Sequence, residues 1–234
     1  MPNPEPEPIR DAVALLNAAG SGIRLGMGPK AFLKLGGCTL VRMAAQTLTT
    51  CVEHALVGVP VDYVAAAREE LKGLAEVFPG GATRQDTVRL LLLKSNEPIV
   101  VVHDVTRPFA SPALIRGVIA AARLHGAAGA FVPSHVPAAL CTDGLVTGYL
   151  HREQVLLPQS PQAYRREVLE SAYRNAADKG LCEQTTWQLV LRDGGRLHPV
   201  SGEDRNIKIT VPFDWELARL LVEPGRQRCD GGLE

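Results

Sequence analysis

The stretch that decides the fold runs from residue 12 to residue 30 and reads AVALLNAAGSGIRLGMGPK. It begins with five apolar residues, 12–16, and passes after Asn17 into a run rich in glycine. A short apolar run bounded by glycines is typical of a buried strand. Small residues after a strand let backbone N–H groups surround phosphate oxygens, and Arg24 and Lys30 add positive charge. The stretch therefore predicts a strand followed by a phosphate-binding loop.

Three kinds of nucleotide-binding loop can be compared with this stretch. A dinucleotide loop needs GxGxxG opening directly into a helix, but Gly26 comes one place late and Gly28-Pro29 interrupts any helix. A P-loop needs GxxxxGK[ST], but Lys30 follows proline and precedes Ala31. The third kind is a nucleotidyltransferase loop, in which an arginine and a Pro-Lys pair follow the glycines and bind a triphosphate. The basic residues favour this loop over a plain glycine-rich turn.

Beyond residue 30, apolar β-type runs alternate with helical patterns. We expect strands at 12–16, 55–60, 98–102 and 127–132 and near 197–200. We expect helices at 39–50, 64–74, from the Gly80-Gly81 turn to about 94, from Ser111-Pro112, at 165–179 and 185–191, and from Pro212. This alternation predicts an α/β fold with a doubly wound, mainly parallel (mixed), Rossmann-like sheet. Ligands of such sheets bind at the carboxyl ends of the strands, which directs attention to residues 17–30 and 103–108.

Residues 134–157 break the alternation. Two apolar runs, 138–141 and 145–150, flank Thr142-Asp143-Gly144, and Asp-Gly between apolar runs indicates a hairpin. We expect a β-hairpin arm at about 134–157 that projects from one domain at residues 11–222. The acidic, proline-rich residues 1–10 and the end of the chain, 223–234, are expected to be disordered tails.

The composition narrows the classes of partner. Lys plus Arg and Asp plus Glu number 25 each, and this balance shows none of the basic excess of a nucleic-acid-binding protein. No apolar run approaches the roughly 20 residues that span a bilayer, and the N-terminus lacks the pattern of a signal peptide. The cysteines are odd in number and form no CxxC pair, which favours reduced thiols over a disulfide or zinc framework. We therefore expect a cytoplasmic protein that binds a small ligand and neither nucleic acid nor membrane.

Five segments together resemble the 2-C-methyl-D-erythritol 4-phosphate cytidylyltransferases of isoprenoid biosynthesis over about residues 12–222. They are AAGSGIRLGMGPKAFLKLGG at 18–37, GGATRQDTV at 80–88, HDVTRP at 103–108, SPQ at 160–162 and NIKIT at 206–210. Members of this family transfer CMP from CTP to 2-C-methyl-D-erythritol 4-phosphate and release pyrophosphate. The resemblance implies this reaction, with Mg²⁺ as cofactor and a homodimer formed through the arm.

The resemblance also assigns roles to residues. It implies that Arg24 and Lys30 are catalytic, because cations against the CTP phosphates stabilise charge that develops at the α-phosphorus. It implies nucleotide binding by Ala18, Ala19, Gly20, Ser21, Gly22, Gly81, Thr87, Asp104 and Lys208, with Asp104 as a candidate metal ligand. It implies acceptor binding by Arg107, Arg152 and Ser160, with Arg152 reaching the acceptor phosphate of a partner subunit. A phosphate monoester nucleophile is already mostly ionised near neutral pH, so no general base is expected.

The acceptor half of the pattern departs from the family. An Asp-Thr pair on the family's arm aligns with Val136-Pro137, and family carboxylates align with Thr185-Thr186, after Gln184. Because of these departures, the sequence does not decide which polyol phosphate is the acceptor. The alternatives are a ribitol-5-phosphate cytidylyltransferase or another sugar-phosphate nucleotidyltransferase, and a nucleotide-binding regulator that has lost catalysis.

Overall fold

A central sheet of seven strands organises the part of the chain that this computed structural model describes, residues 6–20, 22 and 26–222. In spatial order the strands are β11 (His198–Ser201), β7 (Ala127–Pro133), β10 (Leu156–Arg165), β6 (Ile99–Asp104), β1 (Ile9–Asn17), β4 (Val52–Val59) and β5 (Glu76–Pro79). All neighbouring pairs are parallel except those of β10, which is antiparallel to both β6 and β7. The predicted α/β fold with a mainly parallel, mixed sheet is confirmed.

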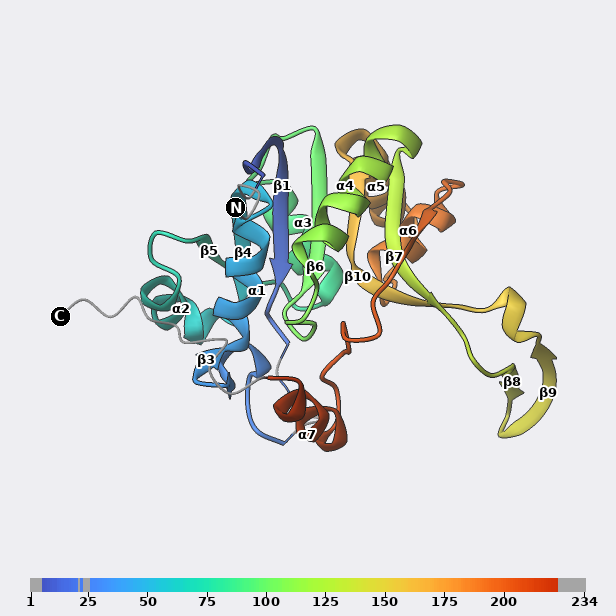
Figure 1. Ribbon diagram of the computed structural model, residues 1–234. Coiled ribbons are helices and arrows are strands. Elements are labelled where there is room, and N and C mark those ends of the chain that lie inside the picture. The colour runs from blue at the N-terminus through green and yellow to red at the C-terminus, as the bar shows by residue number, and fades with distance from the viewer. Residues whose placement is uncertain (1–5, 21, 23–25, 223–234) are drawn as a thin grey trace.

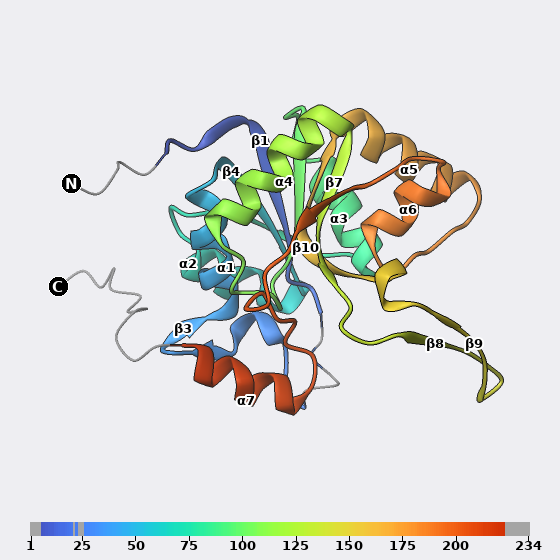
Figure 2. The ribbon, with the colours of Figure 1, turned by 45° about the vertical axis from the view of Figure 1, so that its right-hand side comes forward.

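Helices cover both faces of the sheet (Figures 1 and 2). The alternating side chains of β1 show how. Ala12, Ala14 and Leu16 belong to one buried cluster, and Val13 and Leu15 belong to the other. The first cluster includes residues of α1 (Leu40–Thr49), α2 (Val64–Glu70), α4 (Pro112–His125) and α7 (Pro212–Leu221). The second includes residues of α3 (Arg84–Leu92), α5 (Arg166–Asp178) and α6 (Thr186–Arg192). The sheet is therefore doubly wound, as predicted.

Side-chain caps explain where several of the helices begin. The Thr39 hydroxyl accepts a hydrogen bond from the backbone N–H of Arg42 at the start of α1, and the Ser111 hydroxyl accepts one from Leu114 at the start of α4. Thr83 and Asp86 form a reciprocal capping box at the start of α3. Such caps satisfy backbone donors that have no partner within the helix, so they fix the residue at which each of these helices begins.

The predicted arm is a separate two-stranded hairpin formed by β8 (Ala138–Thr142) and β9 (Leu145–Leu150). Asp143 and Gly144 at its tip have φ angles of 51° and 80°, the left-handed conformation that a tight hairpin turn requires. The hairpin extends well away from the body of the molecule (Figures 1 and 2). Its side chains therefore find few partners within the described residues.

Some predictions need correction. β10 and β5 were not expected, and α2 ends at Glu70 rather than near residue 74. β1 begins at Ile9, inside the stretch expected to be a disordered tail. Cys51, Cys141 and Cys182 are free thiols, but Cys38 is disulfide-bonded, which the cysteine pattern did not indicate. The remaining tail predictions, residues 1–5 and 223–234, lie outside the described residues. Among the helices that the structure describes, none has the length and apolarity needed to cross a membrane.

Candidate functional site

The carboxyl ends of β1 and β6 meet at one edge of the sheet, where Asn17 and Asp104 are paired across the two strands. A cleft of about 450 Å³ opens at this edge. Its described lining comes from four segments that are distant in sequence, and consists of Asn17, Gly20, Gly22, Lys30, Arg84, Asp104, Val105, Thr106, Lys208, Ile209 and Thr210. This position is where parallel α/β sheets bind ligands, and it joins both segments that the sequence singled out.

The glycine loop forms one wall of the cleft. Gly22 has a φ angle of +73°, and a Cβ at this position would lie 1.9 Å from the Gly28 carbonyl oxygen. Only glycine fits such a conformation and approach. The backbone N–H of Ala18 donates to the Gly58 carbonyl (2.8 Å), which fixes the start of the loop to the end of β4. Ser21 and Arg24 lie outside the described residues, so their predicted roles stay predictions.

Lys30 is almost fully buried at the floor of this loop, with 8% of its surface exposed. Its ammonium group donates to the carbonyl oxygens of Ile209 and Thr210, both at 2.9 Å. Lysine is seldom buried without compensating partners. Here the carbonyls hold the cation in the cleft and join the glycine loop to the 208–210 segment.

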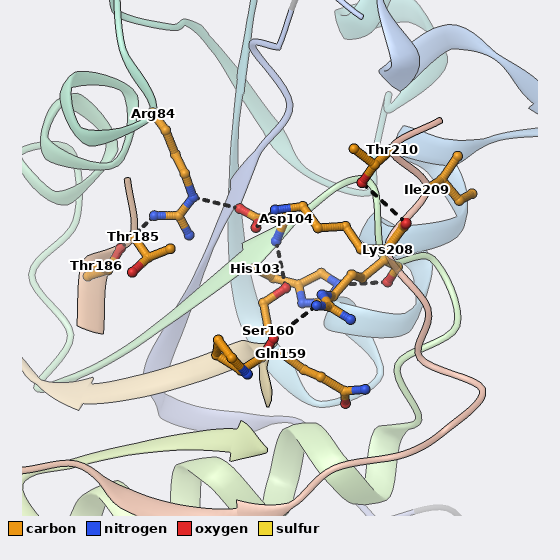
Figure 3. Close-up of polar contacts among 12 residues, drawn as sticks. Arg84, His103, Asp104, Gln159, Ser160, Thr185, Thr186, Lys208, Ile209 and Thr210 are labelled. Atoms are coloured by element: carbon orange, nitrogen blue, oxygen red, sulfur yellow. Dashed lines mark hydrogen bonds and ion pairs between the residues drawn. The ribbon is translucent and has the colours of Figure 1, made fainter. Parts of the chain in front are cut away.

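Asp104, the last residue of β6, lies between two cations (Figure 3). Its Oδ1 is 2.9 Å from Arg84 Nε and its Oδ2 is 3.6 Å from Lys208 Nζ. Burial alone would raise the pKa of Asp104, but the charges of Arg84 and Lys208 outweigh burial and hold the pKa well below its usual range. The carboxylate is therefore ionised at neutral pH.

The described lining has an excess of positive charge. Lys30, Arg84 and Lys208 carry three positive charges, and Asp104 is the only carboxylate among the described residues that line the cleft. Focused positive charge in a cleft attracts polyanions. Together with backbone N–H groups of a glycine loop, it suits a triphosphate better than a neutral ligand.

Arg84 is a site residue that the sequence analysis missed. It is the first residue of α3, and its NH1 donates to the Thr186 hydroxyl (2.9 Å) in addition to the Asp104 contact. An arginine in the first turn of a helix normally points into solvent, so its position alone gave no reason to select it. Its place within the motif at residues 80–88 was the available signal.

Thr87 and Gly81 support the cleft from behind and do not line it. Thr87 is fully buried. Its hydroxyl accepts from the Gly81 N–H and donates to the Thr83 carbonyl, both at 3.0 Å. A Cβ on Gly80 would lie 2.4 Å from the Ala19 Cβ. The Gly80-Gly81 turn therefore packs closely against the glycine loop, and Thr87 holds that turn in place.

Arg107 and Ser160 also lie outside the lining. The Arg107 guanidinium donates to the carbonyls of Pro158 (3.0 Å) and Asn206 (2.5 Å). The Ser160 hydroxyl accepts from the Asp104 N–H (3.1 Å), and the Ser160 carbonyl accepts from Asn206 Nδ2 (2.8 Å). In this structure both residues connect β10 to the segments that carry Asp104 and Lys208.

His103 fixes the turn that follows Asp104. Its Nε2 is 3.0 Å from the Arg107 carbonyl oxygen. A carbonyl can only accept, so the proton of the imidazole is on Nε2. Burial lowers the pKa of His103 to about 4, which makes the ring a neutral donor at neutral pH. His103 therefore stabilises the turn, and the sequence analysis did not include it among the site residues.

Arg152 lies away from the cleft. It begins a short 3-10 turn, Arg152–Gln154, at the base of the arm, and its side chain is 63% exposed. Its Nε contacts Glu153 Oε1 at 2.8 Å, and it is not among the lining residues of the cleft. Val136, also in the arm region, is exposed as well. The structure thus does not bring Arg152 to the cleft of its own chain.

Comparison with known proteins identifies relatives that match most of the chain. Residues 12–224 match the family described as IspD: 2-C-methyl-D-erythritol 4-phosphate cytidylyltransferase. The cytidylyltransferase of that name from Thermus thermophilus is 41% identical, over 89% of this chain and 95% of the relative. The one from Rhodococcus jostii is 38% identical, over 91% and 96%. The crystal structure of the Thermus thermophilus enzyme superposes with a TM-score of 0.77 at 36% identity, covering 89% of this chain and 97% of that one. The chain therefore belongs to the 2-C-methyl-D-erythritol 4-phosphate cytidylyltransferase family.

Proposed function

We propose that this protein transfers CMP from CTP to 2-C-methyl-D-erythritol 4-phosphate, giving 4-diphosphocytidyl-2-C-methyl-D-erythritol and pyrophosphate in non-mevalonate isoprenoid biosynthesis. One observation carries the proposal: the glycine loop, Lys30, Asp104 and Lys208 converge on one cleft at the carboxyl edge of the sheet. Family membership supplies the reaction, and the positive charge of the cleft suits two phosphorylated substrates.

The reaction needs positioning and charge neutralisation. A phosphate oxygen of the acceptor forms a bond to the α-phosphorus of CTP, and the bond from that phosphorus to the bridging oxygen of the β-phosphate breaks. The electron pair leaves with pyrophosphate. Lys30 and, by the family pattern, Arg24 stabilise charge on the transferring and leaving oxygens. Lys208, which Asp104 holds at the cleft, adds positive charge that faces the phosphorylated substrates.

The side chains at the cleft fit the magnesium that the family uses. No group of three or more His, Cys, Asp or Glu side chains capable of holding a metal occurs in the described ranges. Two residues that are paired in register across β1 and β6 nevertheless carry side-chain oxygens at the cleft. They are the ionised Asp104 carboxylate and Asn17 Oδ1, which is buried and has no hydrogen-bond partner among the described residues. Mg²⁺ binds one or two protein oxygens together with substrate phosphates, and these two residues would hold it. The chemistry that the ion supplies when bound is neutralisation of charge on the triphosphate.

A homodimer completes the proposal. Leu145, Val146 and Tyr149 on the arm are each at least two thirds exposed, and an exposed apolar cluster marks an interaction surface. A second copy of the chain is the partner that the family pattern indicates, with Arg152 of the partner subunit reaching the acceptor phosphate. Arginine suits this role because it donates two parallel hydrogen bonds to a phosphate. We place the enzyme in the cytoplasm, in keeping with its phosphorylated substrates.

Pyrophosphate release from CTP tests the proposal directly. The purified protein with Mg²⁺ should release pyrophosphate with 2-C-methyl-D-erythritol 4-phosphate and form the cytidylylated product by mass spectrometry. Ribitol 5-phosphate is the matched comparison, because it tests the acceptor half alone. Turnover with ribitol 5-phosphate only would reassign the acceptor, and tight CTP binding without turnover on either polyol phosphate would indicate a regulator.

A further inference from the structure

Arg84, one of the residues that line the cleft, connects Asp104 to helix α6 (Figure 3). Its Nε contacts Asp104 Oδ1 at 2.9 Å, and its NH1 donates to Thr186 Oγ1 at 2.9 Å. The arginine side chain is 19% exposed and Thr186 is 1% exposed. These three residues are the first of α3, the last of β6 and the first of α6. A series of polar contacts thus joins three elements at the wall of the cleft.

The geometry divides the two oxygens of Asp104 between two cations. Oδ1 contacts Arg84, and Oδ2 lies 3.6 Å from Lys208 Nζ. A guanidinium is a rigid planar group, so a second contact at NH1 restricts rotation of the whole fork. Burial would lower the pKa of Arg84, but the Asp104 charge outweighs burial and raises it. Arg84 therefore stays charged and depends on Asp104 as its counter-ion.

We infer that Arg84 and Thr186 are positioning residues: Thr186 anchors the guanidinium, which orients Asp104 so that its second oxygen holds the Lys208 ammonium at the cleft. The inference rests on the proposed function, because Lys208 acts there on the phosphorylated substrates. Thr186 does not line the cleft, whereas Arg84 does and adds to its positive charge. Each acts through Asp104, and small errors in the placement of a catalytic cation are costly in rate.

Substitution of Thr186 tests the anchor with little change in shape. Thr186→Val removes the acceptor and keeps the volume, whereas Thr186→Ser keeps the hydroxyl. We expect valine to lower kcat about tenfold with the KM for CTP changed less than about twofold, and serine to stay within about twofold of the wild type. Thr47→Val in α1 is the matched control, since the Thr47 hydroxyl donates to the Met43 carbonyl away from the cleft. Equal kcat values for the valine and serine variants would overturn the inference.

A double-mutant cycle separates positioning from packing. In an Arg84→Gln background the valine substitution should have no further effect on kcat, because Thr186 acts only through Arg84. If Thr186 merely packs α6, valine should lower kcat by the same factor in both backgrounds. That additive result would also overturn the inference. Thermal unfolding of each variant shows whether it folds.

A spectroscopic readout keeps this test independent of turnover. The Nε–H of a buried, ion-paired arginine exchanges slowly, so ¹⁵N NMR should show an Arg84 signal that is missing in Arg84→Lys. The signal should persist in Thr186→Ser and broaden in Thr186→Val and Asp104→Asn. If the wild type does not turn over but these signals respond as stated, the contacts from Thr186 through Arg84 to Asp104 are supported and the proposed function is contradicted. An Arg84 signal that is the same in Thr186→Val and the wild type would contradict the inferred role of Thr186, even when the wild type is active.

Discussion

At the scale of single residues, Lys30 offers the most direct test of the cleft. Its ammonium group lies against the carbonyls of Ile209 and Thr210 and forms part of the cleft lining. Lys30→Ala should lower turnover by at least about two orders of magnitude, since one transition-state donor is typically worth 10²–10³ in rate. Steady-state pyrophosphate release measures the effect. Lys34→Ala is the control, because Lys34 is an exposed lysine in the neighbouring strand. A loss of tenfold or less at Lys30 would count against its catalytic role.

His103 predicts a dependence of stability on pH. Its pKa is lowered from 6.5 to about 4 by burial, and its Nδ1 has no hydrogen-bond partner among the described residues. The unfolded chain therefore binds a proton at a higher pH than the folded chain. Stability from this residue is complete above pH 6.5 and is lost as the pH falls toward about 4. The loss is at most about 3 kcal/mol.

The His103→Gln variant supplies the comparison. Its side-chain amide retains a donor for the Arg107 carbonyl but does not titrate, so its unfolding free energy should vary less between pH 6.5 and pH 4. Urea unfolding at several pH values gives the two curves. Parallel curves for the variant and the wild type would show that His103 is not the titrating group.

At the scale of elements, the glycine loop depends on one backbone conformation. Gly22→Ala places a Cβ at a φ angle of +73° and against the Gly28 carbonyl. The left-handed conformation alone costs roughly 1–2 kcal/mol for a residue with a Cβ, so the loop must shift. We expect CTP affinity to fall at least about tenfold, as measured by calorimetry. Gly117→Ala in α4 should leave affinity unchanged, since a Cβ there meets only Val200 at 3.7 Å. Equal CTP affinity for Gly22→Ala and the wild type would contradict a rigid loop.

The elements also show what the sequence could predict. The hairpin at β8 and β9 was predicted because Asp143-Gly144 supplies both a turn signal and the backbone angles for it. β10 was missed because Pro158 and Pro161 interrupt its apolar pattern and its pairing with β7 shifts register between Pro158 and Gln162. Its strand character comes from pairing with β6 and β7, which are far away in sequence. Local propensity carries no such information.

The candidate site also contains residues that the sequence could predict and residues that it could not. Lys30, Asp104 and Lys208 were selected because each follows a strand-like run or lies in a motif, and the structure brings all three to one cleft. Thr87 and Ser160 were predicted to bind substrate, but here they hold backbone groups of Gly81 and Asp104. A hydroxyl in a motif gives no sign of whether it faces a ligand or the protein, because that depends on tertiary contacts. Arg84 was missed because an arginine in the first turn of a helix is expected to face solvent, and only tertiary contacts turn it toward Asp104.

At the scale of the whole molecule, the arm presents apolar side chains that the described residues of its own chain leave exposed. It carries exposed Leu145, Val146 and Tyr149 away from the body, and such an apolar surface in water favours association. We predict a homodimer by sedimentation velocity. Replacement of residues 138–150 by a short Gly-Ser linker should give a folded monomer. A monomeric wild-type protein at micromolar concentration would contradict the proposed dimer.

Complementation between two defective variants tests whether the arm serves a partner's cleft. Lys30→Ala disables the cleft of its own chain, and Arg152→Ala disables only the cleft that its arm reaches. In a mixed dimer, the chain with intact Lys30 receives intact Arg152 from its partner, so one of the two sites works. Random pairing in a two-fold symmetric dimer should therefore restore about a quarter of the sites. Denaturation and refolding of an equimolar mixture, followed by the pyrophosphate assay, measures the recovery. Arg152 side chains that act within their own chain would give no recovery, because the Lys30→Ala cleft and the Arg152→Ala cleft would each remain defective in every pairing.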